Sequence, residues 1–467
     1  MQKFNLIIVG GGAGAFAAAI KANELGAKTL MVNSGLPLGG TCVNVGCVPS
    51  KTLLWAGEVM HQAKHHHIPG LDIEVKNFDF ATVVQNELDL VEKLRSEKYE
   101  KVLGNLEHVT YLDGLVEFVS PNEIIVNDQQ YSAEKFIIAT GSTARVPKIE
   151  GINDVGFVTH IAALKLKQQP KKLIIVGAGP VGLEFAQMYA RFGTKVTILH
   201  HSGSIFSQAE EQLTSRLQEV LEQEGIIVKT NAKVKSARKE VDKKIVTFVV
   251  NDQEEQVSAD EILLAVGKIP NIAELGLDKA EVEITDRQAV KVNPQFQTSQ
   301  PHIFAVGDVT DAPLRLETTA GREGTLAAEN TLKDTKHSID YNTVPWTIFT
   351  DPQLASVGLT EDEQMKQMGV CACRSVSFER IPKAIIMHHT EGLIKMAIHP
   401  ETREIMGVHI LAPNAGELIA EAMMLIKNKN TIDDVVNSLP IFPTLSEAIK
   451  IVAMSFTKDL KKLSCCI

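Results

Sequence analysis

Short apolar runs followed by helix-forming segments recur through the first part of the chain. The runs at residues 4–9 (FNLIIV) and 172–176 (KLIIV) are typical of buried parallel strands, and each passes directly into a glycine-rich turn that opens a helix. A second apolar run follows each helix, at residues 28–33 and 195–201. The pattern therefore predicts two strand–helix–strand units in one chain.

Three further apolar runs, at residues 136–142, 262–271 and 302–310, end in small residues. We expect each to be a strand, placed where the returning chain crosses a dinucleotide-binding domain. The last of these runs ends with Gly307 and Asp308, and this acid is suited to accept hydrogen bonds from a ribityl or ribose hydroxyl.

The pattern changes after residue 343. Alternating strands are predicted at residues 343–349, 392–398 and 404–410, followed by a helix at 416–428. This region is expected to form a separate α+β domain of about 120 residues.

Composition is that of a globular protein of 467 residues, with 44% hydrophobic and 22% charged residues, and the length predicts about three domains. The formal net charge of −10 argues against nucleic acid as a partner, because phosphate binding requires a positive patch. No apolar run approaches the roughly 18 residues of a membrane span, so we expect a cytoplasmic protein. Six cysteines are too few for a secreted disulfide scaffold of this length, so their thiols are expected to do chemistry or to bind metal.

Both predicted units carry the G-x-G-x-x-G/A pattern of a dinucleotide-binding turn. The residues at these positions are Gly10, Gly12 and Ala15 in the first unit and Gly177, Gly179 and Gly182 in the second. The pattern provides a tight turn, a close approach of backbone to pyrophosphate and close helix packing, and the helix N-terminus offers free N–H groups to the phosphates. Two such turns in the right context favour two Rossmann-like domains over incidental glycine-rich turns.

Cys42 and Cys47 lie in the segment GGTCVNVGCVPSK, residues 39–51, at the start of a predicted helix that continues through TLLWAGEVMHQA. Such a pair can close a disulfide, and a helix N-terminus lowers the pKa of a thiol. A structural zinc half-site or two buried small side chains are the alternatives. Zinc would need further ligands, and no second cysteine pair of suitable placement exists.

This segment, both glycine motifs and the AVGD segment together resemble the pyridine nucleotide-disulfide oxidoreductases, the family of glutathione reductase, dihydrolipoamide dehydrogenase and mercuric reductase. The resemblance covers essentially the whole chain. It implies an α/β fold with an FAD domain (1–148 and 268–338), an NADPH domain (149–267) and a C-terminal α+β interface domain (339–467), assembled as a homodimer with active sites shared between subunits.

The resemblance also implies the roles of individual residues. Electrons would pass from NADPH to FAD and then to the cysteine pair, with Cys47 nearest the flavin and Cys42 facing outward. Lys51 and Glu184 match an ion pair beside the flavin N5, and Asp308 with the following helix at about 314–328 would hold the ribityl chain and the N1/O2 edge. The residues expected to bind the two cofactors are Gly10, Gly12, Gly14, Ala15, Asn33, Gly40, Thr41, Lys51, Thr140, Gly141, Asp308, Gly177, Gly179, Gly182, Glu184, His200, His201 and Gly267.

The C-terminal region indicates which chemistry of the family applies. Disulfide-reducing members use a His in an H-P-T-x-x-E segment, whereas this chain has FPTLSE with Phe442, which carries no proton. Mercuric reductases lack that His and end in a vicinal Cys pair, which matches Cys465 and Cys466 in the tail LSCCI. Adjacent thiolates are good ligands for a soft metal ion. A mobile tail of one subunit is therefore expected to collect Hg(II) from small-molecule thiols and pass it to Cys42 and Cys47 of the other.

Mercuric reductases also carry one Tyr that matches Tyr99 and another at the position of Phe442, so a role for the second hydroxyl is lost here. The alternative interpretation of Tyr99 is an aromatic residue on the surface of a helix, without a role in the reaction. The positions of the ribose-binding acids hold Asn33 after the first motif and His200 and His201 after the second, and the absence of an acid there favours NADPH over NADH.

Cys371 and Cys373 would share one face of a strand, where packing is the expected role and a second soft-metal site the alternative. Two other functions remain open for the whole chain. One is a lipoamide- or glutathione-type disulfide oxidoreductase, and the other is a non-catalytic protein that sequesters soft metal ions.

Overall fold

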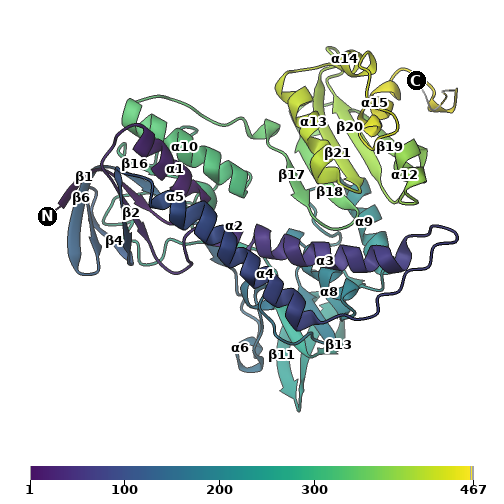
Figure 1. Cartoon of the computed structure of the whole chain (residues 1–467), viewed down its shortest axis with the longest axis horizontal. Helices are drawn as coiled ribbons and strands as arrows, with labels where there is room; N and C mark the ends of the chain where they lie inside the picture. The colour runs from purple at the N-terminus through teal and green to yellow at the C-terminus, as the bar shows by residue number, and fades with distance from the viewer. Residues whose placement is uncertain (1, 463, 465–467) are drawn as a thin grey trace.

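In the computed structural model, which describes residues 2–462 and 464, the chain folds into three lobes that each have a main sheet (Figure 1). The N-terminal lobe lies at the left of the figure, the second at the bottom, and the third, with most of the C-terminal part, at the upper right. The predicted α/β class with a separate C-terminal α+β domain is confirmed. Cys465 and Cys466 lie outside the described residues.

The first lobe is built on a seven-stranded sheet. Its strands, in sheet order, are β3 (Val109–Asp113), β2 (Thr29–Asn33), β1 (Gln2–Val9), β6 (Gln129–Ile138), β5 (Glu123–Val126) and β4 (Val116–Ser120), with β16 (Ile303–Ala305) also paired to β6. The strands β1, β2, β3, β6 and β16 run parallel, and β4 and β5 form an antiparallel extension. The lobe is discontinuous in sequence, because β16 returns to complete a sheet begun by β1.

Helices α1 (Ala13–Glu24) and α10 (Glu317–Lys333) pack backbone to backbone on this sheet. A Cβ atom added at Gly324 would lie 2.1 Å from the carbonyl oxygen of Gly14, so a side chain at this contact would force the helices apart. A Cβ atom added at Gly14 would also lie 3.1 Å from the carbonyl oxygen of Ala320, so the first turns of the two helices lie close together.

The second lobe has a parallel sheet and a small antiparallel sheet. The strands are β10 (Ile227–Lys229), β9 (Lys195–Leu199), β8 (Lys172–Val176) and β14 (Glu261–Leu264) in the first, and β11 (Lys233–Glu240), β12 (Lys243–Val250) and β13 (Gln253–Ala259) in the second. The helices are α6 (Ile152–Val155), α7 (His160–Ala163), α8 (Pro180–Arg191) and α9 (Glu211–Gln223).

The prediction of one strand over residues 262–271 is wrong. Strand β14 ends at Leu264, and the next strand, β15 (Lys268–Pro270), pairs instead with β7 (Ser142–Ala144). Gly267, with φ of +100°, lies between them. The break occurs because the chain leaves the second lobe here and returns to the first, close to the predicted boundary at residue 268, which itself stays a prediction.

The third lobe has a five-stranded antiparallel sheet covered by helices. The strands, in order, are β17 (Trp346–Ile348), β18 (Gln353–Gly358), β21 (Ile405–Ala412), β20 (Leu393–Ile398) and β19 (Ala372–Ser377). The helices are α11 (Glu361–Met368), α12 (Pro382–Ile386), α13 (Ala415–Lys427), α14 (Ile432–Val436) and α15 (Glu447–Met454). The alternating residues predicted to be strands bury one apolar cluster with α13 and α15.

The helix expected to begin at the cysteine pair is interrupted. Helix α2 (Gly40–Val45) holds Cys42, and α3 (Cys47–His65) starts one residue after Gly46, whose φ of −128° and ψ of −111° lie outside the helical range. The break places Cys47 in the first turn of a new helix. In Figure 1, α3 runs from the first lobe toward the space between the other two, beside α4 (Phe80–Arg95).

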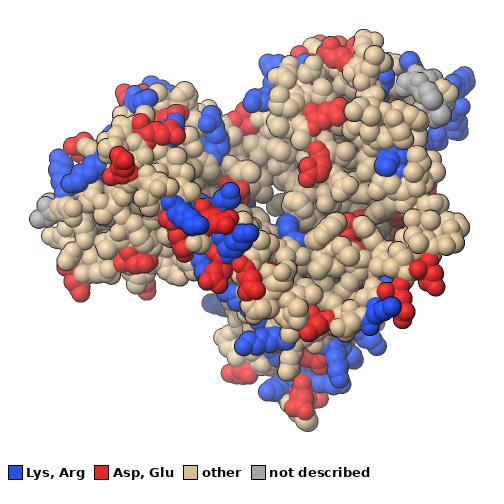
Figure 2. Space-filling view, viewed as in Figure 1, with Lys and Arg blue, Asp and Glu red and all other residues tan. Residues whose placement is uncertain are grey.

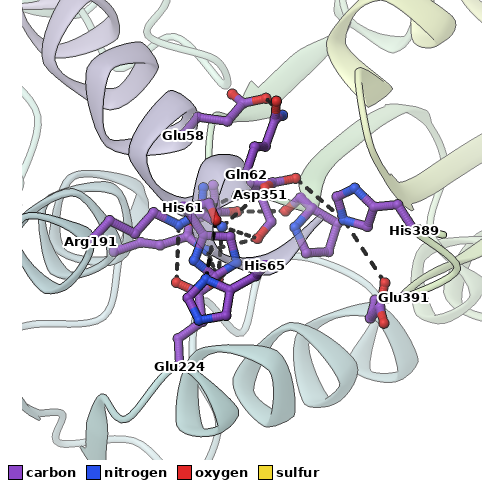
Figure 3. Close-up of polar contacts among 12 residues, drawn as sticks. Glu58, His61, Gln62, His65, Arg191, Glu224, Asp351, His389 and Glu391 are labelled. Carbon is purple, nitrogen blue, oxygen red and sulfur yellow. Dashed lines mark hydrogen bonds and ion pairs between the residues drawn. The ribbon is translucent and has the colours of Figure 1, made fainter. Parts of the chain in front are cut away.

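The three lobes meet at a buried cluster of charged side chains (Figure 3). Arg191, at the end of α8, lies 2.7 Å from Glu224 of the second lobe and 3.0 Å from Asp351 of the third. His61 of α3 is 4.0 Å from Glu224, and His389 of the third lobe is 3.5 Å from Asp351. Burial lowers the pKa of His61 to about 4, so this imidazole is neutral at physiological pH.

One buried acid in α4 has no partner. Glu87 is fully buried, and within the described residues neither of its carboxylate oxygens has a hydrogen-bond partner. Burial raises its pKa to about 7. Since the folded state then holds a proton that the unfolded chain releases near pH 4.5, stability is greatest below that pH and falls as pH rises toward 7.

We expect Glu87→Leu to raise the free energy of unfolding at pH 8 by about 2 kcal/mol, and by much less at pH 5. Chemical denaturation at the two pH values measures this, with exposed Glu92→Leu in the same helix as the control. An equal gain at both pH values would show that Glu87 does not titrate on unfolding.

The face shown in Figure 2 mixes acidic and basic side chains over all three lobes. It presents no broad surface of one charge. Within residues 2–462, no helix has both the length and the apolar content required to cross a membrane.

Candidate active site

Two glycine-rich turns, at the carboxyl ends of β1 and β8, share one geometry. A Cβ atom added at Gly10 would lie 2.2 Å from the carbonyl oxygen of Ala139, and one added at Gly177 would lie 2.3 Å from that of Ala265. Both glycines also have positive φ, +135° and +111°. Glycine is required at each position because the end of the neighbouring strand contacts the turn.

The second glycine of each turn faces open space. A Cβ atom added at Gly179 would meet no atom within 4 Å, and one added at Gly12 would meet only the Cα of Gly40, at 3.8 Å. Helices α1 and α8 begin directly after these glycines, so their unpaired N–H groups lie beside the space. Open backbone at a helix N-terminus suits a pyrophosphate, so both turns fit a dinucleotide.

The other residues of the motifs serve packing. A Cβ atom at Gly182 would lie 2.1 Å from the carbonyl oxygen of Gly177, which keeps the second turn tight. Ala15 is fully buried, and Gly14 forms the contact with α10 described above. These residues shape the sites without facing the space that a ligand would occupy.

A second segment closes the first turn from the opposite side. Gly40 has φ of +60°, and a Cβ atom there would lie 2.6 Å from the Cα of Gly12. Gly40 and Thr41 open helix α2, so the turn after β1 and the segment that carries Cys42 lie in contact. This contact brings the cysteine segment to the predicted FAD site.

Thr140 and Gly141 line the same region and are held by residue 271. The hydroxyl of Thr140 donates to the carbonyl oxygen of Asn271 (2.7 Å), and the Asn271 amide donates to the carbonyl oxygen of Thr140 (2.9 Å). Gly141 and Gly267 have positive φ, and a Cβ atom at either would meet no atom within 4 Å. These two glycines, where the chain passes between the first two lobes, therefore face open space.

Asp308 follows β16 in a short 3-10 turn, as expected of a hydroxyl-binding acid. Its Oδ2 accepts a hydrogen bond from Ser142 Oγ (2.6 Å) and lies 3.6 Å from Lys268 Nζ. The turn is held by buried Glu323 of α10, whose Oε2 accepts from the Gly307 N–H (2.6 Å). Burial raises the pKa of Glu323. Glu323 was not predicted from the sequence, where it reads as an ordinary helix residue.

Asn33 is buried at the end of β2 and faces the first turn. Its Nδ2 donates to the carbonyl oxygen of Leu36 (2.9 Å). Its Oδ1 lies toward Gly11, where an added Cβ atom would approach it to 2.5 Å. A role for this amide oxygen in accepting a ribose hydroxyl stays a prediction.

Cys42 and Cys47 meet as free thiols with unequal acidity. A hydrogen bond from the Cys42 thiol lowers the pKa of Cys47 to about 7, against the opposing effect of desolvation by the surrounding protein and with help from the charge of Lys51. The same hydrogen bond raises the pKa of Cys42. About half of Cys47 is therefore a thiolate at pH 7, whereas Cys42 stays a thiol. Cys47 is exposed and Cys42 half-buried, whereas the resemblance predicts that Cys42 faces outward; their roles beside a flavin stay predictions.

Lys51, one turn after Cys47 in α3, joins the first lobe to the second. Its Nζ lies 2.7 Å from Oε2 of Glu184, a buried residue of α8. The other Glu184 oxygen accepts the N–H of Phe349 in the third lobe (2.9 Å), and Lys51 Nζ lies 4.5 Å from the centre of the Phe349 ring. The ion pair is present, and the sequence gives no sign that Phe349 completes it.

Comparison with known proteins agrees with this arrangement. Residues 4–324 match the pyridine nucleotide-disulphide oxidoreductase family, and residues 344–453 match the dimerisation domain of that family. The chain belongs to this family. Membership implies FAD and NAD(P)H as cofactors, and the two glycine turns fit them.

Several curated members of the family are similar over nearly the full chain. The mercuric reductase of Staphylococcus aureus is 36% identical over 464 residues, covering 99% of this chain and 84% of the relative. That of Streptomyces lividans is also 36% identical, covering 99% and 98%. The dihydrolipoyl dehydrogenase of Geobacillus stearothermophilus is 36% identical over 447 residues, covering 94% and 93%. The overall sequence identity is the same for these mercuric reductases and for the dihydrolipoyl dehydrogenase, so it does not decide between their two activities.

A solved structure in the family has the same fold. The HOCl-induced flavoprotein disulfide reductase RclA from Escherichia coli superposes with a TM-score of 0.86 and 26% identity, covering 97% of this chain and 100% of that one. The arrangement of lobes described above is therefore that of a flavoprotein disulfide reductase.

Tyr99 lies near the thiols of Cys42 and Cys47 and not on an open helix surface. It belongs to a short π-helical segment, Ser96–Glu100, and its ring packs edge-on against Phe16 with centroids 4.9 Å apart. Burial raises its pKa to about 12. Tyr99 thus keeps its proton at neutral pH and can donate a hydrogen bond. Its π-helical turn is a conformation that is frequent at functional sites.

The two histidines after β9 have different environments. His200 is buried, and its Nδ1 accepts the N–H of Ala178 in the second glycine turn (3.2 Å). Burial, with the neighbouring His201, lowers its pKa. His201 is exposed. His200 therefore holds the turn, and contact of either histidine with a cofactor stays a prediction.

A large cavity of about 1550 Å³ opens where the three lobes face one another. It is lined by residues of each lobe, among them Val181 at the start of α8, Lys268, Asp308, Trp346 and Glu361. The cavity is ample for a pyridine nucleotide that reaches from the second glycine turn toward the first lobe.

Glu317 is a site residue that sequence reasoning missed. It is the first residue of α10, and its charge opposes ionisation of both Cys42 and Cys47. The available signal was the expectation that this helix points its N-terminus at the flavin, which makes its first residue a neighbour of the redox centre.

Proposed function

We propose that the chain is an NADPH-dependent flavoenzyme that reduces Hg(II) to Hg(0) at Cys42 and Cys47. The net reaction is NADPH + Hg(II) → NADP⁺ + H⁺ + Hg(0), which balances two electrons. FAD, when bound at the first glycine turn, would carry the electrons between NADPH and the thiol pair. The proposal rests on the thiolate–thiol pair and is supported by the similarity to mercuric reductases.

Phe442 is the observation that favours a metal ion over a disulfide substrate. The residue lies half-exposed after Ile441 and Leu439, which are 79% and 95% exposed, and its ring cannot accept or donate a proton. Dithiol–disulfide exchange requires an acid or base to manage thiol protons. Exchange of a soft metal ion between thiolates does not require one at this position.

The chemistry of the pair suits metal transfer. Cys47 offers a thiolate at neutral pH, and Cys42 releases its proton when a metal ion replaces the hydrogen bond. Two thiolates are the preferred ligands of a soft ion. Lys51, paired with Glu184, adds positive charge beside the pair, and the Tyr99 side chain lies nearby.

We infer that the protein works as a homodimer in the cytoplasm, where thiols stay reduced. The match of residues 344–453 to a dimerisation domain and the exposed apolar segment 439–442 support the dimer. In this arrangement, Cys465 and Cys466 of one subunit would receive Hg(II) from small thiols and deliver it to the pair of the other. NADPH is favoured over NADH because residues 198–204, at the end of β9 and directly after it, contain no acid.

The deciding experiment is anaerobic oxidation of NADPH by the FAD-loaded enzyme, with and without Hg(II) in excess thiol, and with detection of mercury vapour. Hg(II)-stimulated oxidation with one Hg(0) released per NADPH is expected. Oxidised lipoamide and glutathione disulfide serve as parallel substrates. Faster turnover of either disulfide would contradict the proposal, and no stimulated oxidation at all would favour a sequestering protein.

We predict that Cys465→Ala/Cys466→Ala lowers kcat/KM for thiol-bound Hg(II) by roughly tenfold or more, because the collecting thiols are lost. Flavin reduction by NADPH should not change, since that step does not involve the tail. A stopped-flow comparison of both steps measures this. Unchanged turnover of thiol-bound Hg(II) would remove the tail from the mechanism.

A further inference from the structure

Cys371 and Cys373 form a cysteine pair that the proposed reaction does not use. They flank Ala372 at the start of β19, the edge strand of the third lobe's sheet, and the structure joins them by a disulfide bond. Both are half-buried. Packing was the expected role of these two cysteines. The structure differs from that expectation, because their sulfurs are bonded to each other near the surface.

A carboxylate completes the group. Glu361, the first residue of α11, places an oxygen within 4.8 Å of both sulfurs, and within residues 2–462 this is the only set of three potential metal-ligating side chains brought so close. The sequence separates Glu361 from the pair by a whole helix. Two sulfurs and one oxygen form a three-coordinate donor set.

The group is held by a buried amide. Gln364 of α11 is fully buried, and its Nε2 donates to the carbonyl oxygen of Ile398 (2.7 Å). Its Oε1 accepts the N–H of Ala372 (3.3 Å) and lies 3.7 Å from Cys373 Sγ. Since α11 carries both Gln364 and Glu361, the same helix fixes the strand and presents the third donor.

The Glu361 carboxylate is also oriented by charge. Buried Lys395 binds one Glu361 oxygen and lies 2.6 Å from Glu210, and the Glu361 N–H donates to Glu210 (2.6 Å). The lysine fixes the direction of the carboxylate. Two thiolates, two carboxylates and one ammonium leave a net negative charge that favours a cation.

We propose that Cys371, Cys373 and Glu361 form a second soft-metal site, which binds one Cu(I)-like thiophilic d¹⁰ cation when the disulfide is reduced. Opening requires a dithiol reductant: its two thiols become a disulfide, and the Cys371–Cys373 bond becomes two thiols. The metal ion then forms two S–metal bonds and displaces two protons. This site does not depend on the proposed mercury chemistry.

Cu(I) titration against a chromophoric chelator tests the site. The FAD-loaded protein carries Cys42→Ser, Cys47→Ser, Cys465→Ser and Cys466→Ser, so that the other thiols do not bind, and is reduced and desalted without oxygen. We expect one tightly bound Cu(I) per chain, with a thiolate-to-copper absorbance. Adding Cys371→Ser/Cys373→Ser should abolish both the stoichiometry and the absorbance.

Two further variants separate the carboxylate from a general charge effect. Glu361→Gln should weaken Cu(I) binding about tenfold, because one donor is lost. Asp362→Asn, the same charge change at the exposed neighbouring position, should leave it unchanged. Retained flavin absorbance and melting temperature show that each variant is folded. Equal Cu(I) stoichiometry with and without Cys371 and Cys373 would overturn the site.

Discussion

Cys47→Ser is expected to lower Hg(II)-dependent NADPH oxidation by roughly 10³-fold or more, while NADPH still reduces the bound flavin. The reason is the acidity of the pair. The Cys42 hydrogen bond and Lys51 hold the pKa of Cys47 at about 7, so that a thiolate is present at neutral pH. A serine hydroxyl stays protonated there and is a poor ligand for a soft ion.

The pH dependence of the thiolate provides an independent measurement. A thiolate beside an oxidised flavin adds long-wavelength absorbance, which should grow as pH rises through about 7 in the two-electron-reduced enzyme. Cys47→Ser should remove this absorbance. Cys42→Ala should move its midpoint to higher pH, because the hydrogen bond that lowers the Cys47 pKa is lost. Cys42→Ser, which keeps a donor, should move the midpoint less. A midpoint near 9 in the unmodified enzyme would contradict the assigned hydrogen bond.

The second large effect concerns stability. Arg191→Met is expected to lower the free energy of unfolding by about 3–5 kcal/mol, because it leaves Glu224 and Asp351 as buried carboxylates without their partner. The Arg191 side chain is only 4% exposed and bonds to Glu224 through two nitrogens, as Figure 3 shows at the meeting point of the lobes.

An exposed arginine provides the matched control for Arg191. Arg216 pairs with Glu219 at the same 2.7 Å on α9, but the two side chains are 36% and 57% exposed. Arg216→Met should therefore change stability by only about 0.5 kcal/mol. Glu224→Gln added to Arg191→Met should recover part of the loss, since one unpaired charge is removed. Similar denaturation curves for Arg191→Met and Arg216→Met would show that the buried cluster does not hold the lobes together.

Local sequence patterns predicted the elements that carry the cofactor turns. The buried runs before Gly10 and Gly177 form β1 and β8. Glycine is required at these two positions because a neighbouring strand passes close to each turn. The strand–turn–helix pattern depends on residues a few positions apart, whereas the contacts of Gly10 with Ala139 and of Gly177 with Ala265 come from strands distant in sequence. The break at Gly46, which separates α2 from α3 and places Cys47 in a first helical turn, was not predicted, because glycine within a helical pattern does not by itself specify an end.

The sequence by itself determined the fold class, the two glycine turns and the reactive pair Cys42 and Cys47, since each is encoded within one short segment. Only the tertiary structure decided that Phe349 completes the Lys51–Glu184 pair, that Arg191 joins the second lobe to the third and that Glu361 meets Cys371 and Cys373. Except for the two neighbouring cysteines, these contacts join separate elements. Their geometry depends on how sheets and helices pack, and the hydrophobic pattern of a single segment does not specify that packing.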